Sequence, residues 1–306
     1  MKAMFNNPFK KEGNWYKGNL HTHTTNSDGL LSPPEMIGQY RKKNYDFVCI
    51  TDHNRRTDVA CYSDEKFLAI CGEEIGAYRD GKEKDRYDFD IVAVNTRMPL
   101  AGKCRNMPAQ KVIEMIRHDG GEAIIAHPYF MVGCSTAQDI MALEDFIGME
   151  VYNTSVEMCS GRGYSGVYWD ELLCAGRRVW GIAADDAHWH FNEFRPNDTA
   201  VSSVMVKTEK LTVENIMDSL RQGYFYSTNG PLIGDLAITG DTIRIKTDPV
   251  RIINFMGGRS FRKLTASADK LLTEAECKLT GKDNFVRIEC ADDKGHTAWT
   301  NPVFLN

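Results

Sequence analysis

The sequence lacks any closely spaced pair of cysteines. Its nine cysteines are odd in number, and none of them belongs to a Cys-x-x-Cys motif. This scatter argues against a disulfide framework, which normally needs an even number, and against a cysteine-based zinc knuckle, which needs close pairs. We therefore expect reduced thiols, as in a cytosolic protein. The cysteines stand at positions 49, 61, 71, 104, 134, 159, 174, 277 and 290.

Long hydrophobic runs are missing as well. Residues 1–15 contain several lysines and asparagines and no apolar stretch long enough for a signal peptide or a membrane span. From this start of the chain we expect a cytoplasmic protein with no membrane partner.

Basic residues are not in excess, since the formal net charge is −5. A protein that coats nucleic acid is usually basic, so no nucleic-acid partner is expected. A small anionic substrate remains compatible with this charge, because bound metal ions would reverse the local field. The shares of hydrophobic residues, 42%, and of charged residues, 26%, are ordinary for a globular protein. Nothing in the composition indicates an oligomeric state.

Helical and strand-like segments alternate over the first two thirds of the chain. Ser32, followed by Pro33 and by Glu35, has the features of a helix N-cap. Two further helices are expected, one over residues 108–118 and one between a capping Thr212 and a terminating Gly223. Three short apolar strands are expected at 45–50, 123–126 and 179–183, and each runs into a histidine or an aspartate. Because the C-terminal ends of parallel strands share one face of a barrel, these polar residues should converge.

From about residue 231 the hydrophobic pattern becomes alternating. Ile243 and Ile245 share one face of a predicted strand, and in a later strand Val286 and Ile288 oppose the polar face that carries Arg287. We therefore expect two domains: an α/β barrel over residues 1–230 and a small all-β domain over residues 231–306.

Histidines and carboxylates gather at the predicted strand ends. His21 and His23 are two positions apart, so in an extended chain their side chains point the same way and two imidazoles can grip one ion. Asp186 and His188 repeat this spacing. Mixed nitrogen and oxygen ligands suit zinc, manganese or iron, and a site with open positions can make hydroxide from water. Further potential ligands are Asp28, His53, Glu74 and His127.

Five motifs occur in order between residues 18 and 188: GNLHTHTTNSDG at 18–29, ITDHN at 50–54, GEEI at 72–75, AHP at 126–128 and DDAH at 185–188. Together they resemble the PHP (polymerase and histidinol phosphatase) superfamily of metal-dependent hydrolases. The strings LRQGYFYSTNGP at 220–231 and AWTNPV at 298–303 resemble its carbaryl-hydrolase-like branch, which appends a small β domain.

The resemblance implies a distorted seven-stranded (β/α)7 barrel that binds two or three divalent ions (Zn, Mn or Fe) at the C-terminal strand ends. It also implies which residues are catalytic metal ligands. His21, His23, Glu74 and Asp186 would hold a first ion; Glu74 would bridge to a second ion that His127 also binds; Asp28, His53 and His188 would hold a third.

One position departs from the superfamily pattern. Where many members have a histidine, this chain has Asp90. A carboxylate there would harden the second site and shift its preference from zinc toward manganese, iron or magnesium. Two alternatives remain open: Asp90 turns away and leaves that ion short of ligands, or Asp90 is simply solvated.

Other polar residues admit weaker interpretations. Arg162 and Arg195 are candidates for binding a substrate anion, although a solvated salt bridge would explain either one, and His190 is a candidate for lining the pocket. Glu73 competes with Glu74 as the ligand after the third motif. Glu150 and Asn153 are expected just outside the ions' coordination spheres. His118, at a helix end, and His296, in a hairpin loop, are expected to be solvated.

The leading functional hypothesis is hydrolysis of a small-molecule phosphoester by metal-activated hydroxide. Hydrolysis of a carboxylic ester, carbamate or amide would use the same ligands, so the sequence leaves it open. A non-catalytic, metal-stabilised binding domain would be expected to have lost ligands. A proofreading module of the kind attached to polymerases would be expected to have a basic face and a polymerase.

Overall fold

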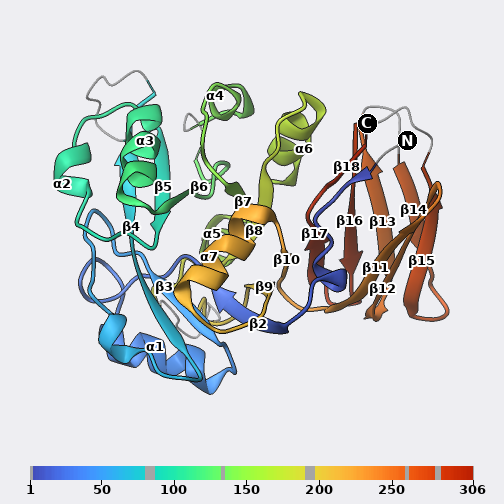
Figure 1. Cartoon of the computed structure of the whole chain (residues 1–306), viewed down its shortest axis with the longest axis horizontal. Helices are drawn as coiled ribbons and strands as arrows, with labels where there is room; N and C mark the ends of the chain where they lie inside the picture. Colours follow the sequence, from blue (N-terminus) through green and yellow to red (C-terminus); the bar gives the residue numbers. More distant parts are fainter. Residues whose placement is uncertain are drawn as a thin grey trace.

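The computed structural model of the chain describes residues 3–79, 87–131, 135–189, 197–258, 262–279 and 284–305. Within these ranges the strands form a fifteen-stranded sheet and a separate three-stranded sheet. Figure 1 shows the α/β part on the left, with helices around its strands, and a part built of strands on the right, where the two chain ends lie close together.

Seven neighbouring strands form the α/β part. In sheet order they are β2 (Asn14–Asn19), β3 (Phe47–Ile50), β4 (Leu68–Ala77), β5 (Phe89–Val94), β6 (Glu122–Ile125), β7 (Gly148–Asn153) and β8 (Trp180–Ala184). Most neighbours are parallel, but β5 is antiparallel to both β4 and β6. Beyond β8 the chain returns to the end of β2, where Asp186 N–H donates to His21 O and His23 N–H donates to Ala187 O. These bonds close the row at the C-terminal ends of β2 and β8.

The expected helices are present, and their ends follow the predicted signals. The first, α1 (Pro33–Lys42), begins with a capping box between Ser32 and Glu35. The helix α3 (Ala109–Asp119) ends at Gly120, whose φ of 90° suits glycine. Thr212 caps α7 (Val213–Gln222) by accepting from Asn215 N–H. The remaining helical segments are η1 (Pro8–Lys10), η2 (Ala60–Tyr62), α2 (Ala101–Cys104), α4 (Ala137–Met141), α5 (Thr154–Ser160) and α6 (Gly166–Cys174).

After α7 the described chain consists of strands. They are β10 (Phe225–Thr228), β11 (Ile233–Thr239), β12 (Thr242–Val250), β13 (Ile252–Gly257), β14 (Arg262–Ala266), β15 (Leu272–Lys278), β16 (Phe285–Ala291), β17 (Thr297–Thr300) and β18 (Val303–Leu305). Strands β11, β12 and β15 form the three-stranded sheet, and the others continue the large sheet. The large sheet is continuous because β9 (Ser203–Thr208) joins β2 to β10, β10 pairs with β17, and β18 pairs with β1 (Ala3–Met4). The two parts therefore share backbone hydrogen bonds.

The polar face predicted for the strand at 285–291 is not a solvent face at Arg287. Val286 and Ile288 are buried as expected, but Arg287 is only 1% exposed. Its guanidinium pairs with Asp170 of α6 and lies 4.7 Å from the centre of the Trp169 ring. The alternation correctly places Arg287 on the face opposite Val286. It does not reveal that α6, which is distant in the sequence, covers the face that carries Arg287.

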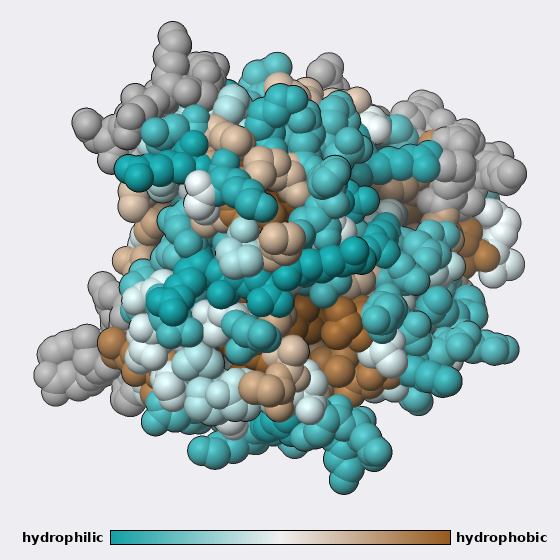
Figure 2. Space-filling model, turned by 60° about the vertical axis from the view of Figure 1, so that its left-hand side comes forward, coloured by the Kyte–Doolittle hydropathy of each residue, from teal (hydrophilic) through white to brown (hydrophobic). Residues whose placement is uncertain are grey.

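The strands of the α/β part carry much of the hydrophobic core. Every residue of β3, β4 and β6 is buried. On the face that includes α2 and α3, apolar residues lie in hollows between hydrophilic ones (Figure 2). None of the described helices is both long and apolar enough to cross a membrane. The buried strands therefore form a packed base that holds the polar motifs in place.

Candidate metal centre

A group of four side chains converges just beyond the ends of β2 and β8, and one of them, Glu74, lies inside β4. His21 Nε2 and His23 Nε2 are 3.1 Å apart, and Glu74 Oε2 lies 3.2 Å from each of them. Asp186 Oδ1 lies 3.3 Å from His21 Nε2 and 3.0 Å from His23 Nε2. All four residues are buried. The predicted first group is therefore assembled by residues from three separate stretches of the chain.

Local backbone conformation sets this convergence. Thr22 forms a parallel bridge with Ala187, which keeps residues 21–23 extended and places both imidazoles on one side. Asp186 has a φ of 53°, in the left-handed region that non-glycine residues rarely adopt. Its N–H bond to His21 O holds it in that conformation. Strain of this kind is common where a side chain must be aimed at a ligand.

A second group shares Glu74 with the first. Glu74 Oε1 is 3.1 Å from His127 Nε2, and the ligand atoms of Glu74, Asp90 and His127 all lie within 4.8 Å of one another. Asp90, on β5, is half-buried. The residue that departs from the superfamily pattern thus faces the group in which it was expected.

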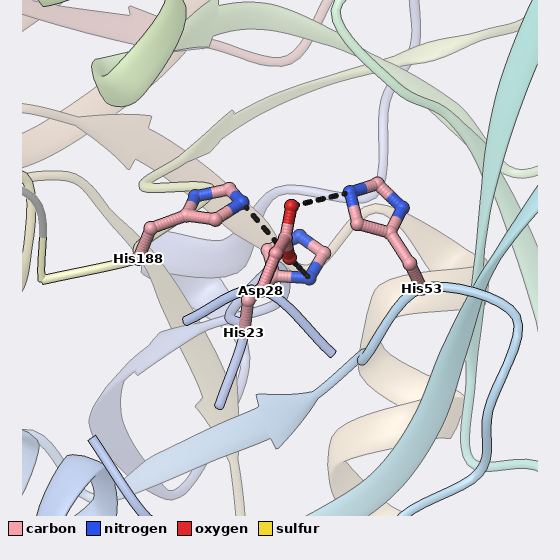
Figure 3. Close-up of side chains that lie close together, drawn as sticks. All are labelled: His23, Asp28, His53 and His188. Carbon is pink, nitrogen blue, oxygen red and sulfur yellow. Dashed lines mark ion pairs between the residues drawn. The ribbon is translucent and has the colours of Figure 1, made fainter. Parts of the chain in front are cut away.

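A third group lies nearer the surface (Figure 3). The carboxylate of Asp28 lies between three imidazoles, 3.4 Å from His188 Nε2, 3.6 Å from His53 Nε2 and 3.8 Å from His23 Nδ1. The Asp28 side chain is 55% exposed and that of His53 is 37% exposed. This end of the cluster is therefore open to solvent, whereas the first group is sealed.

The charges of the cluster shift the pKa values of its members strongly. Burial opposes the charged form of His127, but its hydrogen bond to Glu74 and the charge of Asp186 prevail and raise its pKa to about 10. The pKa of His53 is raised to about 9, because the charge of Glu74 outweighs burial. Burial and the charge of Glu74 raise the pKa of Asp90 to about 6. Without an ion, protons on the imidazoles therefore balance the buried carboxylates.

The first group fits a divalent cation. A tetrahedral zinc site with bonds of about 2.0 Å places its ligand atoms about 3.3 Å apart. Five of the six separations among the four atoms of the first group are 3.0–3.3 Å. Among the described residues, the buried Glu74 Oε2 has no partner with hydrogen-bond geometry, although it lies beside three imidazole nitrogens, those of His21, His23 and, at 2.9 Å, His53. An oxygen in that position suits an ion better than a hydrogen bond.

Glu150 and Asn153 surround the first group, as expected. Glu150 Oε1 is 2.7 Å from His21 Nδ1, which favours the tautomer that leaves Nε2 free for an ion. The other oxygen, Glu150 Oε2, accepts from His127 N–H and from Asn153 Nδ2. Asn153 Nδ2 also donates to Asp186 Oδ2.

Asp52 has a role that sequence reasoning missed. Its buried carboxylate accepts hydrogen bonds from Thr24 N–H (2.7 Å), from the hydroxyls of Thr24 and Ser27, and from Thr57. It therefore holds the loop that carries Asp28. The motif ITDHN contained this residue, but no spacing rule distinguished its task from that of His53.

Other candidates lie elsewhere. The carboxylate of Glu73 accepts from Leu100 N–H and Ala101 N–H at the start of α2, so it does not compete with Glu74. His118 is exposed, and His296 is partly exposed and lies 3.0 Å from Asp292. Arg162 is half-buried in the segment after α5. His190 and Arg195 lie outside the described residues.

Comparisons with known proteins give a fold likeness. No family model matches the chain. An uncharacterized protein of Methanocaldococcus jannaschii, MJ1587, is 28% identical over 150 residues, which cover 45% of this chain and 81% of that protein. An amidohydrolase from Chromobacterium violaceum aligns with 56% of this chain and 87% of its own, with 14% identity and a TM-score of 0.44.

A similarity that spans 93% of the chain is to a crystal structure from Bacteroides vulgatus. It is a two-domain protein containing a predicted PHP-like metal-dependent phosphoesterase, and it aligns with a TM-score of 0.51 and 14% identity over 93% of this chain and 94% of its own. At that identity the likeness concerns the fold. The chain therefore shares the mixed α/β architecture of that two-domain protein.

Proposed function

We propose that this chain is a metal-dependent phosphoesterase of the PHP superfamily, in its carbaryl-hydrolase-like branch, and that it acts on a small anionic substrate. The observation that carries the proposal is the geometry of the first group, a buried site in which five of the six separations among two imidazole nitrogens and two carboxylate oxygens are 3.0–3.3 Å. The fold shared with a protein that contains a PHP-like domain supports it.

The residues have distinct roles in this proposal. His21, His23, Glu74 and Asp186 hold the first of two or three ions, Glu74 is shared with a second site made with Asp90 and His127, and Asp28, His53 and His188 hold a third. When bound, divalent ions act as Lewis acids and activate water near neutral pH. Glu150 keeps His21 in the tautomer that binds through Nε2.

The exposure of the cluster indicates where substrate enters. The third group is open to solvent through Asp28 and His53, while the side chains of the first group are at most 8% exposed. A phosphoryl group arriving there would meet imidazoles and ions, and Arg162 remains a candidate to bind its charge. In this scheme residues 1–230 form a catalytic barrel of the distorted (β/α)7 kind, and residues 231–306 form an accessory β-rich domain.

The test begins with the metal content of the purified protein. The apoprotein, reloaded with Mn, Fe or Zn, is then assayed on aryl phosphate mono- and diesters beside aryl carboxylate esters and carbamates. We expect phosphoester turnover that a chelator removes and metal restores. Turnover confined to carboxylate esters or carbamates would show that the substrate is not a phosphoester. A protein that binds no divalent ion would overturn the whole proposal.

A further inference from the structure

Asn153 stands at the end of β7 with its side chain fully buried. Its Nδ2 donates to Glu150 Oε2 at 2.8 Å and to Asp186 Oδ2 at 3.3 Å. One amide group therefore contacts a candidate metal ligand, Asp186, and also Glu150, the carboxylate that orients a second ligand, His21.

The orientation of this amide follows from its other contact. Asn153 Oδ1 accepts from Val156 N–H at 2.9 Å and so caps α5. A flipped amide would place its carbonyl oxygen against two carboxylates and its NH2 group against an N–H donor. Only the observed orientation satisfies all three neighbours.

Glu150 links the Asn153 amide to two candidate metal ligands, His21 and His127. Its Oε2 accepts from Asn153 and from His127 N–H, while its Oε1 lies 2.7 Å from His21 Nδ1. A carboxylate that moved in response to the loss of one donor would also move the His21 ring. The Asn153 amide is thus connected to His21, His127 and Asp186, which belong to two of the three groups.

We propose that Asn153 is a positioning residue, whose two N–H donors fix Asp186 and the Glu150–His21 pair in the geometry that binds the first ion. This inference rests on the proposed metal-dependent function. It separates two tasks within one side chain: Oδ1 caps α5, and Nδ2 sets the ligand geometry.

Two substitutions distinguish these tasks. Asn153→Asp keeps the size of the side chain and an oxygen that can cap α5, but it replaces the donor with a charge facing two carboxylates. Asn153→Ser also keeps a capping oxygen and adds no charge. Thr212→Ala is the matched control, because it removes a helix cap that belongs to α7 and contacts none of the candidate ligands.

Each full-length variant is stripped of metal and titrated with Zn2+ against a chromophoric chelator, and the visible spectrum of bound Co2+ reports the number and geometry of its ligands. We expect both Asn153 variants to lose about 10–100-fold in Zn2+ affinity, the range typical of residues that orient metal ligands. Their Co2+ spectra should change, while Thr212→Ala should lower the melting temperature and leave metal binding intact.

The outcomes distinguish a failure of the proposed function from a failure of the proposed role of Asn153. If the wild-type protein binds no Zn2+, the proposed function fails, and the role of Asn153 fails with it. If the wild-type protein binds Zn2+ and both Asn153 variants match it in affinity and Co2+ spectrum, the positioning role is overturned while the proposed function stands. If Asn153→Asp does not fold, the neutral Asn153→Ser decides alone.

Discussion

Two places among the described residues where charge is buried are built differently. At the contact between β16 and α6, Arg287 donates through Nε and Nη2 to both oxygens of Asp170 and through Nη1 to Glu289. Beyond the ends of β2 and β8, imidazoles and carboxylates crowd together, and Glu74 Oε2 has no partner with hydrogen-bond geometry among the described residues. The Arg287 contact needs no added ion, because each guanidinium nitrogen donates to a carboxylate oxygen.

The difference separates a structural use of buried charge from a ligand-binding one. A guanidinium whose three nitrogens all donate to carboxylates is expected to fix two elements against each other. A cluster whose carboxylates are balanced only by protonated imidazoles leaves room for a cation to replace those protons. Substitutions in the cluster should therefore reduce metal binding and hydrolysis, whereas substitution of Arg287 should reduce stability.

The largest expected effect is on catalysis. Asp186→Asn keeps the size of the side chain but removes a charge from the first group, so hydrolysis should fall by more than about 100-fold while the fold is retained. Steady-state kinetics with circular dichroism and metal analysis would check this. Full activity in a folded, metal-replete variant would remove Asp186 from the site.

Arg287→Met should instead reduce stability. It leaves Asp170 without its guanidinium partner, but because that carboxylate is 34% exposed, we expect a loss below the about 3 kcal/mol that breaking a fully buried pair costs. Urea unfolding measures this loss, and the affinity for Zn2+ should stay as in the wild-type protein. The double variant Arg287→Met/Asp170→Leu should recover part of the stability. A variant that lost metal instead would show that the two places are not independent.

Asp90→Ala tests the second group by itself. If Asp90 is a ligand, the variant should lose the second ion, and its preference for manganese or iron over zinc should weaken, because a hard oxygen donor is gone. Metal content after loading with equimolar Mn, Fe and Zn gives the answer. Unchanged content and preference would exclude a remodelled second site.

The smallest expected effect concerns pH. In the metal-free protein His53 and His188 have pKa values of about 9 and His127 one of about 10, all above the unfolded value of about 6.5. The folded state therefore holds these protons more tightly. The stability that the three imidazoles contribute should be fully present below about pH 6.5 and be lost as the pH rises through 9 to 10. Thermal melts with and without Zn2+ measure the decline, which added metal should reverse.

The Arg287 contact provides the contrast for that measurement. The guanidinium stays charged throughout this range, so this pair should contribute no pH dependence of its own. A metal-free protein whose melting temperature is flat from pH 6.5 to 9 would contradict the assigned balance of charges in the cluster.

Much of this protein can be predicted from its sequence, because the relevant signals are local. A capping box predicts α1, and the spacing of His21 and His23 predicts two imidazoles on one side of an extended chain. The positions of His127 and Asp186 after predicted strands indicate that they converge, since parallel strands end at one face. Glu74 was expected at a strand end too, but β4 continues past it to Ala77 because it pairs with the antiparallel β5. The motif resemblance assigned these residues to groups that the structure assembles.

Only the tertiary structure decided the rest. Arg287 alternates with apolar residues, yet its burial depends on Asp170, 117 residues away. The amide of Asn153 is oriented by the nearby Val156 N–H, and it donates a hydrogen bond to Asp186, which is 33 residues away in the sequence. Local periodicity records which side of an element a residue occupies, whereas the groups that cover that side are brought there by packing between distant segments.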